Sequence, residues 1–264
     1  MAQPSPPPSR EAPAEVPLYG PLCRAVDLGY ELNADTVYWP GGEGFCLCMS
    51  TSGASPAGGA NDFYAAGSFS CAEHGGTHVD APFHFYEHGV TVEKLRLDQL
   101  IGCARVVRTQ QADVTPEVIL SHEAEHGTLP RGCIFLCDTD WARQYAGGSC
   151  SYLGHDEAAQ GPFDPAVHTL RFPGVTRAAA ELLVARGVAA VGLDTASLDP
   201  GSCKTFDAHR VLLAAGVYGI ENLTGELRRL PPRGSTVMAM PLKLTGGSGA
   251  PARVVAFLPP IGWQ

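Results

Sequence analysis

Four side chains of metal-binding type fall within the short stretch 74–84, namely His74, His78, Asp80 and His84. Imidazole nitrogens and carboxylate oxygens are common zinc ligands. A single histidine is usually a surface residue or a hydrogen-bonded core residue. Three histidines and an aspartate in one run bounded by glycine and proline favour a metal site. We therefore expect this stretch to bind a divalent ion.

The spacing of these residues limits how they can reach one ion. On a straight strand, at about 3.3 Å per residue, His74 and His78 would lie roughly 13 Å apart. Ligands of one zinc ion must lie within roughly 4 Å of each other. The chain must therefore turn between them, and Gly75-Gly76 allows that turn. His78 and Asp80 can converge directly because they share one side of an extended segment, and a carboxylate such as Asp80 can also bridge two metals.

A second pair of candidate ligands lies closer to the C-terminus. His209 falls about one turn into a predicted helix, 206–215, which Gly216 ends. The apolar segment 217–222 is predicted to return as a strand and to bring Glu221 level with His209. A carboxylate buried in such a strand is costly unless it is paired or bound to a metal. Glu221 is therefore a candidate ligand, with an arginine pair or exposure to solvent as the alternatives.

The other residues of metal-binding type form no comparable pattern. His122 and His126 lie four apart at a polar helix end, and we interpret them as solvated. The nine cysteines are scattered, and several fall in apolar runs, as buried free thiols do. This usage fits a reducing compartment, so we expect a cytoplasmic protein.

Alternating strand and helix signals predict a mixed α/β fold that positions these residues. Thr176 is expected to cap a helix over 177–186 that Gly187 closes. Segment 51–60 is predicted to be a surface loop, and 147–173 a long connection that could act as a lid or binding loop. The predicted strands include 45–49, 104–109, 134–137, 188–193, 237–243 and 254–258.

Composition narrows the class of protein. The chain has 264 residues, 45% of them hydrophobic and 17% charged, as in an ordinary globular enzyme. A net charge of −9 argues against a nucleic-acid partner. No apolar run approaches the roughly 18 residues of a membrane span, so no membrane association is expected. Residues 1–20, rich in proline, serine and alanine, are expected to be a disordered tail, and 21–264 a single domain.

Stretch 74–84 matches the pattern His-x-Gly-Thr-His-x-Asp-x-Pro-x-His without a gap. It resembles the metal-dependent cyclase family that includes bacterial kynurenine formamidase and isatin hydrolase. Segments 192–195 and 221–223 also look like that family. The resemblance implies a three-layer β/β/α fold of the swivelling type with a mixed sheet, and a homodimer or homotetramer.

The resemblance also implies a role for each site residue. Asp80 would bridge two metal ions, Zn²⁺ or Mn²⁺, bound to each chain. His84 would be the general acid or base rather than a ligand. The implied ligands are His74, His78, Asp80, His209 and Glu221.

The expected function is hydrolysis of a small amide, an arylformamide such as N-formylkynurenine or a cyclic amide such as isatin. A bound metal lowers the pKa of its water toward about 7, and His84 would carry a proton to the leaving nitrogen. A metal-dependent lyase or cyclase and a non-catalytic binding protein that retains the site are the alternatives. Candidates for an aromatic substrate pocket are Trp39, Phe83, Phe85 and Trp141.

Overall fold

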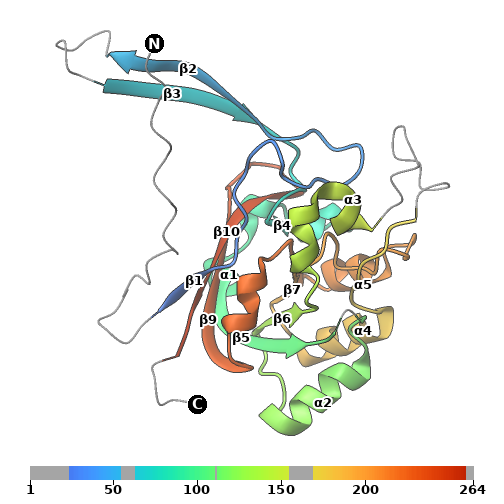
Figure 1. The fold of residues 1–264 in the computed structure, drawn as a ribbon. Helices are drawn as coiled ribbons and strands as arrows, with labels where there is room; N and C mark the ends of the chain where they lie inside the picture. The colour runs from blue at the N-terminus through green and yellow to red at the C-terminus, as the bar shows by residue number, and fades with distance from the viewer. Residues whose placement is uncertain (1–23, 55–62, 111, 155–168, 260–264) are drawn as a thin grey trace.

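The computed structural model describes residues 24–54, 63–110, 112–154 and 169–259. Strands and helices are interspersed along these segments, which confirms the mixed α/β class (Figure 1). The predicted tail, 1–20, lies outside the described residues, and the single domain over 21–264 stays a prediction.

The main sheet is mixed and closes on itself. Strands β5 to β8 pair in parallel with one another, whereas β4, β9 and β10 pair antiparallel with their neighbours. Because β9 pairs with both β5 and β10, the seven strands from β4 to β10 form a barrel, to which β1 adds beside β10. The strands are β1 (Ala25–Asp27), β4 (His78–Asp80), β5 (Ile101–Arg108), β6 (Ile134–Asp138), β7 (Ala190–Leu193), β8 (Tyr218–Glu221), β9 (Arg233–Pro241) and β10 (Gly249–Phe257).

Helices cover the outer side of the parallel strands (Figure 1). The covering helices are α2 (Pro116–His126), α4 (Arg177–Arg186) and α5 (Asp207–Ala214). Shorter helices are α1 (Leu97–Leu100) and α3 (Gly148–Leu153), with 3-10 turns η1 (Pro82–His84), η2 (Val92–Lys94), η3 (Ala142–Gly147) and η4 (Gly225–Arg229).

Strand β6 shows the two cores that this arrangement creates. Ile134 and Leu136 belong to an apolar cluster fed by all seven barrel strands, so they point into the barrel. Phe135 and Cys137 point the other way and pack with the helices. A strand buried on both faces must be apolar throughout, which explains the continuous apolar run.

The helix over 177–186 confirms the capping signals. The Thr176 hydroxyl accepts a hydrogen bond from the Ala179 N–H, and Gly187 ends the helix at φ 70°.

The expectation for His122 was wrong. This residue was interpreted as solvated, but it is only 8% exposed. It lies on the face of α2 that carries Ile119, which packs in the helix-side core.

Segment 51–60 does not begin as a loop. Residues 51–54 continue β2 (Cys46–Ala54), which pairs with β3 (Phe63–Ser70) in a two-stranded hairpin that projects from the barrel (Figure 1). Within 147–173, residues 148–153 form α3, and 155–168 lie outside the described residues. None of the described helices is long and apolar enough to cross a bilayer.

Candidate metal centre

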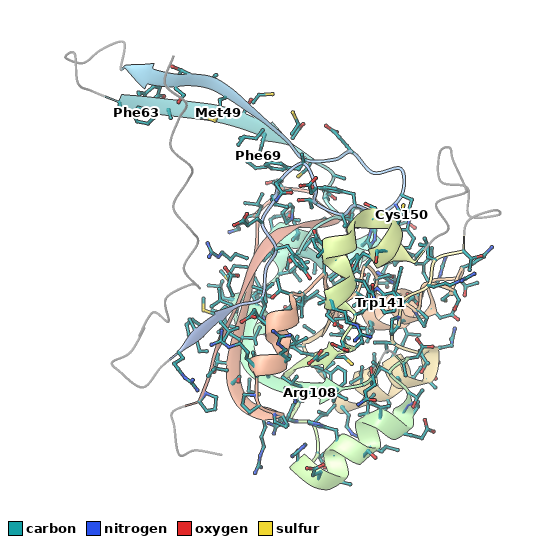
Figure 2. The ribbon with its side chains drawn as sticks, viewed as in Figure 1. Met49, Phe63, Phe69, Arg108, Trp141 and Cys150 are labelled. Carbon is teal, nitrogen blue, oxygen red and sulfur yellow. The ribbon has the colours of Figure 1, made fainter. Side chains whose placement is uncertain are left out.

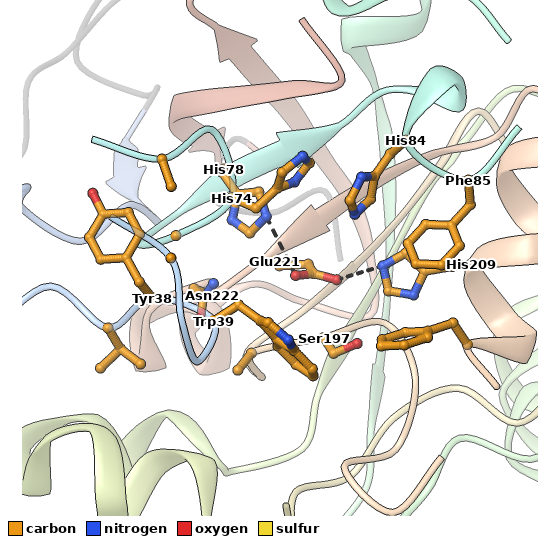
Figure 3. A pocket seen from close by; sticks show the side chains of 16 residues that line it. Tyr38, Trp39, His74, His78, His84, Phe85, Ser197, His209, Glu221 and Asn222 are labelled. Atoms are coloured by element: carbon orange, nitrogen blue, oxygen red, sulfur yellow. Dashed lines mark ion pairs between the residues drawn. The ribbon is translucent and has the colours of Figure 1, made fainter. Parts of the chain in front are cut away.

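Strand β4 supplies two of the expected ligands. Val79 packs inside the barrel, so His78 and Asp80 on either side of it point outward, toward the helices. In the antiparallel pairing with β8, His78 lies opposite Glu221, which therefore shares this face. The Nε2 atom of His78 lies 3.3 Å from Oδ1 of Asp80. It also lies 3.5 Å from Oε2 of Glu221 (Figure 3).

Helix α5 brings His209 to the same place. Its Nε2 lies 3.3 Å from Oδ2 of Asp80 and 3.1 Å from Oε1 of Glu221. On the other side of the ring, the Asp199 carboxylate accepts from Nδ1 at 2.6 Å and from the backbone N–H groups of Ala208 and His209. Asp199 therefore caps the first turn of α5 and orients the His209 ring at once.

His74 reaches the cluster from the segment between β3 and β4, where the chain turns through Gly76 at φ 55°. Its Nδ1 lies 2.7 Å from Oδ1 of Asp80, and its Nε2 lies 2.8 Å from the Ser248 hydroxyl. That hydroxyl donates its single proton to Glu73 at 2.5 Å, so it accepts from His74. The Nδ1 lone pair of a neutral His74 is thereby turned toward Asp80.

The three imidazoles share one pattern that fits a metal. In each ring one nitrogen donates to an oxygen outside the cluster; for His78 this is the Gly76 carbonyl at 3.0 Å. The other nitrogen faces Asp80 or Glu221, and a carboxylate has only acceptor atoms. Either a proton or a metal ion must therefore lie between each nitrogen and the carboxylate that it faces. The buried Nε2 of His78 and Oδ2 of Asp80 have no hydrogen-bond partner, as expected of atoms that bind a metal ion.

Two donor groups within the described residues have the spacing of a metal site. One contains His74, His78 and Asp80, and the other Asp80, His84 and His209, with the donor atoms of each group within 4.8 Å of one another. The groups meet at Asp80, whose Oδ1 faces His74 and His78 while its Oδ2 faces His209. A single carboxylate thus serves both groups.

Burial and mutual attraction set the charges in this cluster. Burial opposes charge on Asp80, yet the imidazoles around it hold its pKa well below the usual value. Burial also opposes charge on His78, but Asp80 and Glu221 raise its pKa to about 9. The pKa of His209 is raised well above its usual value against burial, first by Asp199. In the metal-free protein, protons therefore occupy the positions between these atoms.

His84 lies beside the other histidines but differs from His78 and His209 in the direction of its pKa shift. Its ring stacks on that of His74 with a centroid separation of 3.8 Å and lies 5.9 Å from that of His209. Burial lowers the pKa of His84 to about 4, against the opposing effect of Asp80. The imidazole is consequently neutral at pH 7 and has a lone pair that can accept a proton.

Glycines flank Asp80 on both sides in the sheet. Asp80 pairs with Gly219 on β8 and with Gly249 on β10. A Cβ atom at Gly219 would lie 3.2 Å from Oδ2 of Asp80, and one at Gly249 would lie 2.5 Å from Cε1 of His74. The two missing side chains leave the space that the carboxylate and the His74 ring occupy.

A cavity of about 300 Å³ opens beside the cluster. His74, His78, His84 and His209 line it, together with Glu221. Aromatic walls face them: Trp39 and Phe85, both expected from the sequence, pack around Phe206 at centroid distances of 5.9 and 5.2 Å (Figure 3). Apolar walls facing a few polar groups are typical of a site for a small molecule.

The other two expected pocket residues do not line this cavity. Phe83 is 40% exposed and lies outside the cavity wall. Trp141 packs on a separate apolar cluster that contains Tyr152, and its indole N–H donates to the Tyr152 carbonyl at 2.8 Å. Its backbone N–H is held by the buried Asp194. Of the four aromatic residues suggested by the sequence, Trp39 and Phe85 therefore line the cavity and Phe83 and Trp141 do not.

Sequence reasoning missed two residues that shape the centre. The role of Asp199 depends on the packing of α5, which brings Ala208 and His209 to its carboxylate. Phe206 adopts a left-handed conformation, φ 52°, which is uncommon for an aromatic residue and typical of functional sites. No sequence signal marks this conformation.

The sequence of this chain is similar to those of known proteins. Residues 26–200 match the family model described as "Putative cyclase". Isatin hydrolase of Roseibium aggregatum is 32% identical over 71% of this chain and 72% of its own. Kynurenine formamidase of Salinibacter ruber is 30% identical over 87% of this chain and 95% of its own.

Solved structures share the architecture as well. Isatin hydrolase A from Ralstonia solanacearum superposes with a TM-score of 0.75 at 28% identity, over 89% of this chain and 92% of its own. An isatin hydrolase bound to the product analogue thioisatinate gives a TM-score of 0.74 at 27% identity, over 90% of this chain and 93% of its own.

Proposed function

This chain belongs to the putative cyclase family, with isatin hydrolase and kynurenine formamidase among its relatives. On that premise we propose that it is a metal-dependent hydrolase of small aromatic amides, either an arylformamide such as N-formylkynurenine or a cyclic amide such as isatin. The three-layer β/β/α swivelling description of its fold is part of this proposal, as are the homodimer or homotetramer and the cytoplasmic location.

The observation that carries the proposal is a cluster of histidine nitrogens and carboxylate oxygens that face one another beside a cavity with aromatic walls. His74 and His78 direct nitrogens at one oxygen of Asp80, and His209 directs a nitrogen at the other. Asp80 would contribute ligand atoms for each of two ions, and Glu221 would join His209 in holding the second. The residues would hold Zn²⁺ or Mn²⁺, which suit nitrogen and carboxylate ligands. When bound, such ions polarise a carbonyl and acidify water.

The chain's own residues supply positioning and proton transfer. Trp39 and Phe206 would hold the aromatic ring of the substrate with its carbonyl toward the histidines. His84, neutral at pH 7, accepts a proton from the attacking water and returns it to the leaving nitrogen. Its stacking on His74 keeps the imidazole at the boundary between cavity and metal ligands.

Turnover of a defined panel tests the proposal. Protein reconstituted with Zn²⁺ or Mn²⁺ is assayed on N-formylkynurenine, isatin and related cyclic amides and lactones, with product mass as the readout. Hydrolysis requires the uptake of one water. A product that has lost water instead would establish a lyase or cyclase, and stoichiometric metal without turnover of any compound would favour a binding protein.

A further inference from the structure

The two donor groups of the metal centre are supported in different ways. In the group with His209, the ring nitrogen that faces away from the cluster is held directly by Asp199 at 2.6 Å. In the group with His74, which we call the first donor group, the corresponding nitrogen is Nε2, and it lies 2.8 Å from the Ser248 hydroxyl. A carboxylate again stands behind it, because Oε2 of Glu73 lies 2.5 Å from that hydroxyl. The support of His74 therefore passes through a serine.

Glu73 and Ser248 are held firmly to each other. Glu73 lies in the segment that joins the base of β3, near Phe69, to β4 (Figure 2). Its Oε2 accepts two hydrogen bonds from Ser248, one from the hydroxyl and one from the backbone N–H at 3.0 Å. Ser248 directly precedes β10, which pairs with β4. The pair thus ties the segment that carries His74 to a neighbouring strand of the site.

The Glu73 carboxylate decides the direction of the Ser248 hydroxyl proton. An ionised carboxylate accepts hydrogen bonds and donates none, so the hydroxyl turns its proton to Glu73 and offers His74 a lone pair. A neutral His74 then carries its proton on Nε2, and its Nδ1, 2.7 Å from Oδ1 of Asp80, is free to bind an ion. Without Glu73, the hydroxyl is free to donate to Nε2 instead. The single proton of the ring would then move to Nδ1, where the ion has to bind.

The support of the first donor group lies near the surface. The side chain of Glu73 is 37% exposed and that of His74 22%, whereas those of His209 and Asp199 are 4% and 2% exposed. Glu73 belongs to none of the apolar clusters found among the described residues. Its substitution therefore leaves both cores intact, and an effect on metal binding can be separated from an effect on folding.

We propose that Glu73 is a positioning residue of the first donor group, which acts through the Ser248 hydroxyl to hold His74 in the tautomer that binds an ion. The proposal rests on the proposed function and deepens it, because it concerns one of the two ions that the function requires. Partners that orient a metal ligand typically change metal affinity by about 10–100-fold. The ring of His209 has Asp199 as its own partner, so the loss of Glu73 should weaken one ion and spare the other.

Zinc titration of the full chain against a chromophoric chelator tests the proposal. Glu73→Ala is expected to weaken one ion by about 10–100-fold and to leave the other within a few-fold. Glu73→Gln is the conservative variant, since its amide oxygen can accept both hydrogen bonds from Ser248, and it should stay within a few-fold of wild type. Glu87→Ala, at an exposed glutamate beyond η1, is the control and should bind both ions as wild type does.

A double-mutant cycle tests whether Glu73 acts through the hydroxyl. Ser248→Ala removes the hydroxyl and keeps the backbone N–H that also donates to Glu73. If Glu73 acts by directing the hydroxyl proton, Glu73→Ala should weaken the ion by no more than about twofold once Ser248→Ala is present. Thermal unfolding of the metal-free variants is followed in parallel, and their Tm values should stay close to that of wild type.

Four results would overturn the proposal. They are an unchanged zinc affinity in Glu73→Ala, equal weakening of both ions, a Glu73→Gln variant as weak as Glu73→Ala, and an undiminished effect of Glu73→Ala beside Ser248→Ala. Turnover is measured separately on the zinc-loaded wild type. If the variants behave as expected but the wild type hydrolyses none of the amides, the proposed activity fails and the role of Glu73 stands.

Discussion

The Nε2 atom of His209 lies 3.3 Å from Oδ2 of Asp80, which joins helix α5 to strand β4 across the candidate metal centre. Both atoms are buried, and Asp80 turns its other oxygen to His74 at 2.7 Å. The contact makes the N-terminal histidine motif half of a site that α5 and β8 complete. Because Asp80 contacts the histidines of both donor groups, its substitution should affect metal binding by both groups.

Metal removal should lower the thermal stability of the protein. A ligand that binds only the folded state at about 1,000 times its dissociation constant contributes about 4 kcal/mol. Chelation should therefore lower Tm, and Zn²⁺ or Mn²⁺ should restore it, as followed by calorimetry with metal analysis. Asp80→Asn, which removes the charge that both donor groups share, should abolish the response to added metal. A full response in that variant would place the binding elsewhere.

His84→Ala should retain the metal but lose about 10²–10⁴-fold in kcat, the range for loss of a general acid or base. The imidazole of His84 is neutral at pH 7, whereas His74, His78 and His209 each turn a nitrogen toward Asp80. Metal stoichiometry and kcat are measured on the same sample. His88→Ala, at an exposed position on the same segment, is the matched control and should keep wild-type turnover. If His84→Ala loses metal and activity to the same extent, His84 is a metal ligand instead.

Gly249→Ala should weaken metal binding by about 10–100-fold, the usual cost of disturbing the support of a ligand. The new methyl group would lie 2.5 Å from Cε1 of His74 and 2.6 Å from the Val79 carbonyl oxygen, so the ring must move. Gly44→Ala is the control, since nothing lies within 4 Å of a Cβ there. Competition with a chromophoric chelator measures both affinities, and unchanged affinity in Gly249→Ala would show that His74 can shift without loss.

His122 should make the protein less stable in mild acid. Burial lowers the pKa of His122 to about 4 from the usual value near 6.5, so between these values the unfolded chain binds a proton that the folded chain does not. Stability is therefore unaffected above pH 6.5 and falls by about 1–3 kcal/mol as pH drops to 4. Urea unfolding across this range should show a smaller fall for His122→Leu than for wild type. His88→Leu should follow wild type; if His122→Leu does too, the assigned cause is wrong.

The local elements of this protein could be predicted from its sequence because their signals are short in range. Thr176 and Gly187 mark the ends of α4 through hydrogen bonds and dihedral angles of neighbouring residues. The ligands His74, His78 and Asp80 were recognisable because they lie in one run, and the structure brings them together. Glu221 was inferred from the high cost of burying an unpaired carboxylate in an apolar strand.

Strand pairing and helix packing decided the rest, because both depend on residues far apart in the chain. Only the register of β4 with β8 sets Glu221 opposite His78, and only the packing of α5 lets Asp199 orient His209. The same dependence explains why Phe206 entered the cavity unforeseen while Trp141 packed elsewhere. The motif at 74–84 thus identified the candidate ligands of one donor group. The closed sheet determined that Asp80, between two glycines, stands at its centre.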